Sequence, residues 1–447
     1  MKSSTLFRCS SCQAETPKWS GQCAACGEWN TLEEGQSVKI KGQKSSKGIS
    51  TQEVQMLSMG VDQKYSRIPS GLSEIDRVLA GGFLSDAAVL IGGEPGIGKS
   101  TLLLQVAHTV VKSGMKLLYI SGEESLSQVS ARYGRLQEKE RGEIHFLNEY
   151  GLEEIIATIE TSRPHVVIID SIQTISSVEI AGTMGSPSQV RHGVEVLTSL
   201  AKRMGFLVLL VGHVTKDGQV AGPKAVEHIV DVVLYLEGER SGNMRILRSL
   251  KNRFGPVDEL GVLEMTEKGF QDLKNPSEYL LRERNTEGFG SVLTCCIEGS
   301  RAFLMEVQVL TSSTNFGYPK RSSNGFPTNR LDILLAVAQK YLGLKLDDVD
   351  VYVNVVGGMN VKDRAMDLAV MVALISSYQK KSLPPYLVVW GEVGLTGEIR
   401  SVNLSTKRMK ESDVIENVQR IIPKNTDAGV KKGGDGFRHI REVMGEM

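Results

Sequence analysis

A glycine-rich segment at residues 92–101 constrains the fold more than any other feature of this 447-residue sequence. It reads GGEPGIGKST and contains the pattern G-x-x-x-x-G-K-[ST]. The apolar run AAVLI precedes it and the helical pattern STLLLQVAHTVV follows it, so the segment joins a strand to a helix. Backbone N–H groups of such a loop wrap phosphates at the positive end of a helix. The sequence therefore predicts a nucleotide site inside an α/β domain.

The loop also supplies the side chains that nucleotide phosphates require. Lys99 adds a positive charge beside the β- and γ-phosphates, and Ser100 is expected to ligate Mg²⁺. The residues expected to contact the nucleotide are Gly93, Glu94, Pro95, Gly96, Ile97, Gly98, Lys99, Ser100 and Thr101.

Short β-branched runs alternate with helical patterns between residues 61 and 275. Strands are expected at 87–91, 117–121, 166–169, 207–212 and 232–236, and helices near 99–113, 125–138, 151–162 and 188–204. Alternation of this kind predicts a parallel sheet with helices on both faces. A second α/β region follows, with strands expected at 303–311, 350–356 and 386–390 and helices at 328–342 and 363–380.

Acidic residues and one histidine follow three of these strands. VVIID ends in Asp170, which is typical of a carboxylate in the magnesium shell of a nucleotide. In the segment SGEES, Glu123 is a candidate to orient the attacking water, and Glu124 is a weaker candidate. Alternatively, both are acidic residues of the kind favoured at the amino terminus of a helix. His213 either contacts a γ-phosphate or makes an ordinary hydrogen bond.

The segment KNRFG, at residues 251–255, places two cations beside a glycine. Lys251 and Arg253 are candidates for fingers that reach a transferring phosphate. They are also compatible with contacts to DNA phosphates, or with ordinary surface ion pairs. The residues alone leave these three roles open.

Four of the six cysteines fall in the first 26 residues, as two C-x-x-C pairs: Cys9 with Cys12, and Cys23 with Cys26. Each pair places two sulfurs on one tight turn, and two facing turns supply four thiolates in a tetrahedron, which suits Zn²⁺. Zinc also explains how about 30 residues fold with almost no core. A redox dithiol and an iron cluster are the alternatives.

Composition excludes several classes of protein. Lys and Arg total 52 and Asp and Glu total 52, which excludes a globally basic nucleic-acid coat and an acidic disordered tail. No apolar run approaches the roughly 20 residues of a membrane helix, and no apolar segment of a secretory signal follows the first residues. We expect a cytoplasmic protein without membrane contacts.

The Lys-, Gly- and Ser-rich segment at 33–60 is expected to be a flexible linker. Cys295 and Cys296 are expected to be buried small apolar residues.

The four-cysteine cluster, the loop EPGIGKSTLLLQ, SGEES and KNRFG together resemble the bacterial RadA (Sms) family of DNA-repair ATPases, over nearly the whole chain. KNRFG is that family's own signature, whereas many ATPases share the phosphate loop. The resemblance implies a C4 zinc knuckle at 1–32, a RecA-like ATPase domain at 61–275 and a Lon-protease-like α/β domain at 276–447.

The same resemblance implies roles for individual residues. Glu123 stands where RecA-like and ring-helicase ATPases keep the catalytic glutamate, and His213 falls at their γ-phosphate sensor strand. In ring helicases, the segment like KNRFG carries cations to the ATP of the neighbouring subunit. This implies that Lys251 and Arg253 act in trans and that the active form is a ring or filament, with a hexamer as the expected homo-oligomer.

The resemblance to the Lon peptidase domain raises the question of protease activity. Lon enzymes use a serine nucleophile that a lysine activates. Met366 occupies the serine position here, Ser412 stands opposite the lysine, and Lys410 is nearby without a serine to activate. Two further serines are expected to be helix residues only: Ser376 and Ser377. A thioether cannot replace a hydroxyl nucleophile, so we expect a scaffold without peptidase activity.

The sequence leaves the DNA-contacting residues open. Arg191 lies in the Gly- and Ser-rich segment 176–193, where RecA-like proteins keep DNA-binding loops; an ordinary surface loop is the alternative. The basic residues of the last domain either bind DNA or are solvated charges: Lys362, Arg364, Lys407, Arg408 and Lys410.

The first hypothesis is a DNA-dependent ATPase of homologous recombination that moves along single-stranded DNA and processes branched intermediates with the RecA recombinase. ATP, Mg²⁺ and Zn²⁺ are the expected cofactors. The zinc knuckle would contact a partner such as RecA, or DNA. The alternatives are an ATP-gated clamp or loader without translocation, and an ATP-dependent protease, which Met366 opposes.

Overall fold

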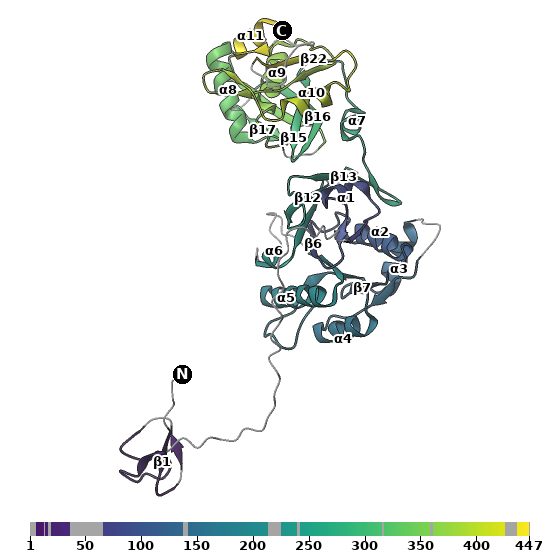
Figure 1. Cartoon of the computed structure of the whole chain (residues 1–447). Coiled ribbons are helices and arrows are strands. Elements are labelled where there is room, and N and C mark those ends of the chain that lie inside the picture. The colour runs from purple at the N-terminus through teal and green to yellow at the C-terminus, as the bar shows by residue number, and fades with distance from the viewer. Residues whose placement is uncertain are drawn as a thin grey trace, which may run out of the picture. The chain divides into compact units, whose positions relative to one another are not determined.

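The computed structural model describes residues 6–12, 14–16, 19–35, 66–136, 142–212, 225–238, 242–314, 317–357, 361–424 and 436–446. The chain divides into two compact units, Met1–Gln63 and Lys64–Met447. Figure 1 labels many of the helices and strands used below. None of the described helices is long and apolar enough to cross a membrane.

The first unit contains a small antiparallel sheet with the order β2-β1-β3. Its strands are β1 (Leu6–Cys9), β2 (Glu15–Thr16) and β3 (Leu32–Gly35). Among the described residues of this unit, the buried apolar side chains are Cys9, Cys23 and Leu32, which is too little apolar surface for an independent core. The sheet continues to Gly35, past the boundary expected at residue 32. The rest of the linker expected at 33–60 lies outside the described residues.

A nine-stranded sheet organises the first part of the second unit, with the order β14-β13-β12-β11-β6-β10-β9-β7-β8. The strands from β11 to β8 in this order are parallel, and β12, β13 and β14 extend the sheet as antiparallel hairpins. The strand bounds are β6 Ala88–Gly93, β7 Leu117–Ser121, β8 His145–Leu147, β9 Val166–Asp170, β10 Leu207–Val211, β11 Val232–Glu237, β12 Met244–Asn252, β13 Leu260–Thr266 and β14 Gly269–Asp272.

Helices cover both faces of this sheet because the parallel strands are apolar on both sides. One face packs against α1 (Ser73–Val78), α2 (Lys99–Lys112) and α3 (Leu126–Arg135). The other packs against α4 (Leu152–Ser162), α5 (Pro187–Met204) and α6 (Ala225–Ile229). The short elements are β4 Arg67–Ile68, β5 Phe83–Leu84 and the 3₁₀ turn η1 Ile172–Thr174. This is the RecA-like P-loop ATPase fold that the sequence predicts.

The last part of the chain forms a seven-stranded mixed sheet with the order β17-β18-β16-β15-β19-β22-β23. Its strands are β15 Ser291–Glu298, β16 Arg301–Ser313, β17 Arg321–Asn324, β18 Val349–Val355, β19 Leu387–Val389, β22 Gln419–Pro423 and β23 Gly436–Phe437. A small hairpin pairs β20 (Glu392–Val393) with β21 (Ile399–Arg400). Its helices are α7 Pro276–Leu281, α8 Thr328–Leu342, α9 Met366–Gln379, α10 Ser405–Ser412 and α11 Ile440–Glu446.

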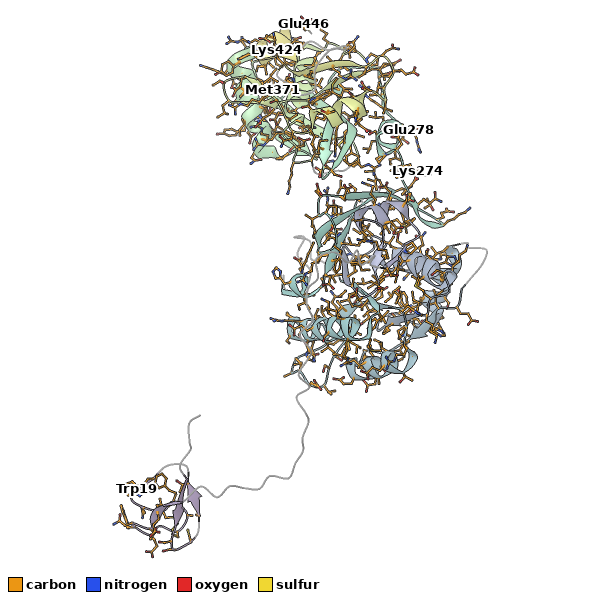
Figure 2. The ribbon with its side chains drawn as sticks, viewed as in Figure 1. Trp19, Lys274, Glu278, Met371, Lys424 and Glu446 are labelled. Atoms are coloured by element: carbon orange, nitrogen blue, oxygen red, sulfur yellow. The ribbon has the colours of Figure 1, made fainter. Side chains whose placement is uncertain are left out.

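Helix α9 is the centre of this Lon-protease-like α/β domain. Every residue from Met366 to Ser377 is buried, and Met371 lies in the interior (Figure 2). Helices α8 and α11 share its apolar cluster, whereas a smaller cluster around Trp390 is packed by Met409 of α10. A helix apolar on all sides fits only between other elements, so α9 fixes the domain's interior.

Most of the expected elements are confirmed, with ends shifted by a few residues. The predicted helices at 328–342 and 188–204 correspond to α8 and α5. The hairpins β12–β14, the strands β15 and β22, and the helices α7 and α10 were not expected from the sequence. Their shorter or mixed patterns carry a weaker periodic signal than a strand buried on both faces.

Candidate nucleotide and metal sites

The phosphate loop lies between the carboxyl end of β6 and the amino end of α2, at the edge where parallel strands end. Gly93 and Gly98 have φ values of 155° and 112°. A Cβ on Gly93 would lie 2.5 Å from the carbonyl oxygen of Leu236, and one on Gly98 would lie 2.7 Å from the Phe270 ring. Glycine is therefore required at both positions for conformation and for space.

Lys99 is 5% exposed and points back across the loop. Its Nζ donates hydrogen bonds to the carbonyl oxygens of Gly93, at 2.8 Å, and Glu94, at 3.0 Å. Burial lowers the pKa of Lys99, while the nearby charges of Asp170 and Glu123 oppose that shift. The loop therefore holds a cation beside the expected phosphates, with two carboxylates close enough to influence it electrostatically.

The two carboxylates come from neighbouring strands. Asp170 ends β9, opposite Ser121 of β7, and Glu123 follows β7 by two residues. Tyr119 donates a hydrogen bond to Oδ2 of Asp170 at 2.7 Å, and Ser171 donates one to Oε1 of Glu123, also at 2.7 Å. Burial and the Asp170 carboxylate raise the pKa of Tyr119 well above its usual value, so the phenol remains a donor. The structure thus brings Lys99, Asp170 and Glu123 to one edge of the sheet.

Glu123 and Glu124 have different surroundings. Arg132 of α3 donates to both carboxylate oxygens of Glu124, at 2.7 and 2.5 Å, and this pairing raises the pKa of Arg132. Glu123 is exposed and turned toward Ser171. Of the two acids, Glu123 is the one directed toward the loop. Neither Tyr119 nor Ser171 was singled out from the sequence, although both lie next to the motifs that were.

Magnesium fits the polar groups at this edge. Ser100 is the second residue of α2, beside the loop, and Asp170 is the last residue of β9, two strands away from β6 in the sheet. Hydroxyl and carboxylate oxygens are the ligands that Mg²⁺ prefers. His213, the expected γ-phosphate sensor, lies outside the described residues.

Lys251 and Arg253 lie at the opposite edge of the sheet from the loop. Lys251 pairs with Val233 near the start of β11, and the start of β11 pairs with the start of β6. The loop follows the other end of β6. The structure therefore does not bring the two cations of KNRFG to the phosphate loop of the same chain.

The four amino-terminal cysteines converge as predicted. Their sulfur atoms all lie within 4.8 Å of one another, with Cys9 to Cys26 at 3.7 Å and Cys12 to Cys23 at 3.6 Å. A tetrahedral site with Zn–S bonds of about 2.3 Å places its sulfurs about 3.8 Å apart. All four cysteines are free of disulfides. The cluster therefore fits a Zn²⁺ ion, which would supply the cross-link that the unit's small core lacks.

The positions that correspond to the Lon serine and lysine are occupied by Met366 and Ser412, which cannot form a Ser–Lys dyad. Met366 is fully buried at the start of α9. The Ser412 hydroxyl donates to the Met409 carbonyl and accepts from Nε of Arg420, both at 2.8 Å, while Lys410 is exposed. Ser376 and Ser377 bind backbone groups through their hydroxyls, as expected of helix residues. Cys295 and Cys296 are buried within β15, also as expected.

Arg408 is not available to DNA. It is 1% exposed, forms an ion pair with Asp363 at 2.7 Å and donates to the carbonyl of Cys295. Both interpretations made from the sequence, a DNA contact and a solvated charge, are wrong for this residue, because α10 carries it inward. The other candidates are exposed: Arg191, Lys362, Arg364, Lys407 and Lys410.

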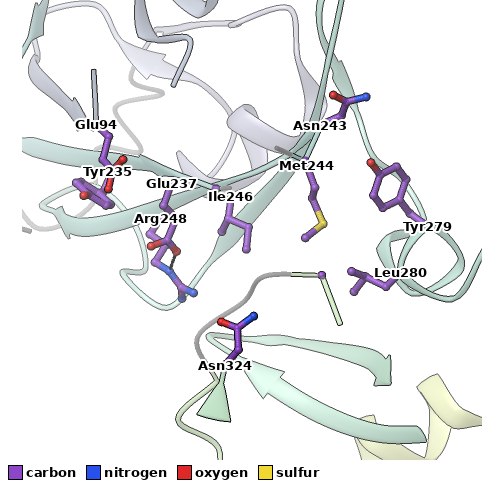
Figure 3. A pocket seen from close by; sticks show the side chains of 13 residues that line it. Glu94, Tyr235, Glu237, Asn243, Met244, Ile246, Arg248, Tyr279, Leu280 and Asn324 are labelled. Carbon is purple, nitrogen blue, oxygen red and sulfur yellow. Dashed lines mark hydrogen bonds and ion pairs between the residues drawn. The ribbon is translucent and has the colours of Figure 1, made fainter. Parts of the chain in front are cut away.

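A cavity of about 440 Å³ lies beside the phosphate loop but is not the nucleotide site. Glu94 and Tyr235 line one part of it, and Met244, Leu280 and Asn324 line another (Figure 3). The groups expected to act on the nucleotide, Lys99, Asp170 and Glu123, are not among its lining residues. Glu94 is the only residue of the phosphate loop among the residues that line this cavity.

Comparisons with known proteins match both the domain that carries the phosphate loop and the four-cysteine unit. Residues 61–219 match the family model described as an AAA domain, and residues 7–34 match a rubredoxin metal binding domain. The chain is 43% identical to the DNA repair protein RadA of Bacillus subtilis (strain 168), over 99% of this chain and 98% of that protein. It is 42% identical to RadA of Brucella abortus, over 94% of this chain and 92% of that protein. RadA of Pseudomonas aeruginosa is 43% identical, over 94% and 93% of the two chains.

Solved structures show weaker similarity. A DnaB-like replicative helicase, solved in a study of its interactions with primase, aligns with a TM-score of 0.42 at 17% identity, covering 48% of this chain and 64% of that chain. A separately solved ATPase domain aligns with a TM-score of 0.41 at 16% identity, covering 48% and 94%.

Proposed function

Because the chain belongs to the RadA family of DNA repair proteins, we propose that it is a DNA-dependent ATPase of homologous recombination. We further propose that it moves along single-stranded DNA and processes branched intermediates together with the RecA recombinase, in the cytoplasm. The observation that most directly supports an ATPase shared between subunits is the placement of the ATPase groups at the two edges of one sheet.

At the carboxyl edge, the chain's own residues would bind and orient ATP. The backbone N–H groups of residues 93–101 would surround the phosphates, and Lys99 would leave its two carbonyl partners to contact the β- and γ-phosphates. Ser100 and Asp170 would hold Mg²⁺, which neutralises charge on the phosphates. Glu123 would orient the attacking water, with Ser171 fixing its carboxylate.

At the other edge, the KNRFG segment would serve a neighbouring subunit. Arg253 lies level with the start of β6, and the five steps from Ala88 to Gly93 cover about 16 Å at 3.3 Å per residue. No arginine or lysine side chain spans that distance to its own nucleotide. Cations from this segment therefore reach an ATP only in another copy of the chain, which supports a closed homo-oligomer, with a hexameric ring as the proposed form.

In this proposal the other two domains would support the ATPase. The Lon-protease-like domain would be a scaffold without peptidase activity, because a thioether stands where a hydroxyl nucleophile is needed. The zinc-binding unit would contact a partner such as RecA, or DNA.

The test is ATP hydrolysis by the purified protein with and without single-stranded DNA. We expect DNA to raise the rate, and Lys99→Ala to lower it by about 10²-fold or more in both conditions. Lys112→Ala, at the exposed far end of α2, is the matched control and should hydrolyse ATP like the wild type. Hydrolysis that ignores DNA would contradict the motor. DNA-stimulated hydrolysis without strand displacement would instead support an ATP-gated clamp.

A further inference from the structure

Strand β12 presents its alternate side chains to two different parts of the chain. Met244 and Ile246 belong to the apolar cluster of the Lon-protease-like domain, and both project into the cavity described above (Figure 3). Leu247 belongs instead to an apolar cluster of the ATPase domain. Arg245 alternates with Met244 and Ile246 along the strand, so its side chain leaves β12 on the ATPase side.

The Arg245 side chain is buried against the phosphate loop. It is 7% exposed, and its Nε donates a hydrogen bond to the carbonyl oxygen of Ile97 at 3.3 Å. Its Nη1 donates to the carbonyl oxygens of Met244, at 2.9 Å, and Gly242. A planar guanidinium that is buried and bonded in two directions has little freedom to move. The position of the Ile97 carbonyl is therefore coupled to that of β12.

The Ile97 carbonyl belongs to the same planar peptide unit as the N–H of Gly98. In a trans peptide these two groups point in opposite directions, so a donor that holds the carbonyl from the β12 side turns the Gly98 N–H away from β12. Gly98 has a φ of 112° and no Cβ, which makes rotation of this peptide easy unless a neighbour holds it. Gly98 also precedes the first turn of α2, and N–H groups at this end of a helix bind phosphates.

We propose that Arg245 is a positioning residue of the nucleotide site, which holds the Ile97–Gly98 peptide so that the Gly98 N–H faces the phosphates of ATP. Arg245 itself makes no contact with the nucleotide in this proposal. It links the phosphate loop to the strand on which the Lon-protease-like domain packs. The proposal rests on binding of ATP at the loop, which the proposed function requires, and not on DNA, on RecA or on a ring.

The first test compares two variants that differ in one group. In Arg245→Gln, the amide nitrogen follows three side-chain carbons, as Nε does in arginine, so a donor to Ile97 is retained. In Arg245→Met, a methyl group occupies that place. Both variants lose the Nη1 donor to Met244 and Gly242, so a purely structural role of the guanidinium predicts equal effects.

The measurement is the affinity of the full-length protein for ADP, read with a fluorescent ADP analogue. We expect Arg245→Met to weaken binding by about 10–100-fold, the range for one lost hydrogen bond to a charged group, and Arg245→Gln to stay within about threefold of the wild type. Ile246→Ala, on the opposite face of β12, is the matched control and should bind ADP like the wild type. Equal affinities of Arg245→Met and Arg245→Gln would overturn the proposal.

The second test observes the Gly98 amide directly. An isoleucine precedes a glycine at two places in the sequence, 91–92 and 97–98. Protein labelled with ¹³C at isoleucine carbonyls and ¹⁵N at glycine therefore gives two selected amide signals in solid-state NMR. ADP should shift the Gly98 signal in the wild type and in Arg245→Gln, and should shift it far less in Arg245→Met. If Arg245→Met does not fold, Arg245→Gln decides, because loss of the shift in that variant would overturn the proposal.

Failure of the proposed function gives a different result. If the wild type binds no ADP, the loop is not a nucleotide site, and both the proposed function and the role of Arg245 are wrong. If the wild type binds ADP and Arg245→Met binds it equally well, the ATPase function stands and only the role of Arg245 is overturned.

Discussion

At the scale of single residues, the two adjacent acids after β7 show how position decides chemistry. Glu124 is occupied by both guanidinium nitrogens of Arg132, whereas Glu123 faces Ser171 at the end of the strand that carries Asp170. Both carboxylate oxygens of Glu124 accept hydrogen bonds from Arg132, so they are already occupied. In the proposed function, Glu123 is therefore the acid that orients the water.

We predict that Glu123→Gln abolishes hydrolysis while ATP still binds. The amide keeps the shape of the side chain but cannot accept the proton of water, so kcat should fall by about 10²–10⁴-fold. Glu124→Gln should change kcat far less and should match Arg132→Met, since both variants break the same pair. Nucleotide binding by fluorescence and steady-state hydrolysis measure the two effects separately. A larger loss in Glu124→Gln than in Glu123→Gln would reverse the assignment.

At the scale of elements, the zinc-binding sheet has a very small apolar core, so the metal site is expected to contribute most of its stability. Of the residues described in this unit, Cys9, Cys23 and Leu32 form the buried cluster, and two tryptophans, Trp19 and Trp29, are 58% and 68% exposed. Burying so little apolar surface does not offset the entropy of ordering the chain.

We therefore predict that chelation unfolds this unit alone. Four thiols should become reactive to a thiol reagent as zinc is released, while Cys295 and Cys296, buried in β15, should react only after denaturation. Tryptophan fluorescence should report the change because two of the three tryptophans lie in this unit. Reaction of the two β15 cysteines at the same rate would show that the loss of zinc propagates into the second unit.

Helices α8 and α9 are joined by a buried ion pair. Arg330 donates through Nε to Oδ1 of Asp367 at 3.0 Å and through Nη2 to Oδ2. Burial raises the pKa of Asp367, and Arg330 opposes that shift. Breaking a buried pair by removing one partner leaves an uncompensated charge, which costs about 3–5 kcal/mol.

We predict that Arg330→Met destabilises the protein and changes its dependence on pH. Without the cation, the folded-state pKa of Asp367 should rise further above its unfolded value of about 3.9. The protonated acid is then favoured in the folded state, so stability is retained below that value and lost as pH rises through the raised pKa. Thermal unfolding should show a smaller deficit relative to wild type at pH 5 than at pH 8. A deficit independent of pH would mean that the lost contacts, not the charge, matter.

What the sequence could predict depended on how local each feature is. The phosphate loop and the C-x-x-C pairs are contiguous motifs whose chemistry requires a fixed spacing, so both were predictable. The pairing of Tyr119 with Asp170, and of Arg245 with Ile97, joins residues far apart in the chain through the order of the strands. Arg408 was misassigned for the same reason, because its burial depends on packing of α10 that no short pattern encodes.

At the scale of the whole molecule, the two edges of the ATPase sheet are compatible with the proposed head-to-tail assembly. In that assembly, one subunit would present its phosphate loop and the next would present Arg253, so each active site would be shared. Mixing two inactive variants tests this directly. Lys99→Ala lacks a working loop but keeps Arg253, and Arg253→Gln has the reverse defect.

In randomly mixed rings from equal amounts of the two variants, a site is intact when an Arg253→Gln subunit supplies the loop and a Lys99→Ala subunit supplies the arginine. About a quarter of the sites meet this condition, so DNA-stimulated hydrolysis should recover to about a quarter of the wild-type rate if sites act independently. Each variant alone, and a mixture of Lys99→Ala with the double variant Lys99→Ala, Arg253→Gln, should remain inactive. Mixed oligomers, verified by differential labelling, that stay inactive would contradict shared sites, because an intact loop and an intact arginine would then face each other without producing hydrolysis.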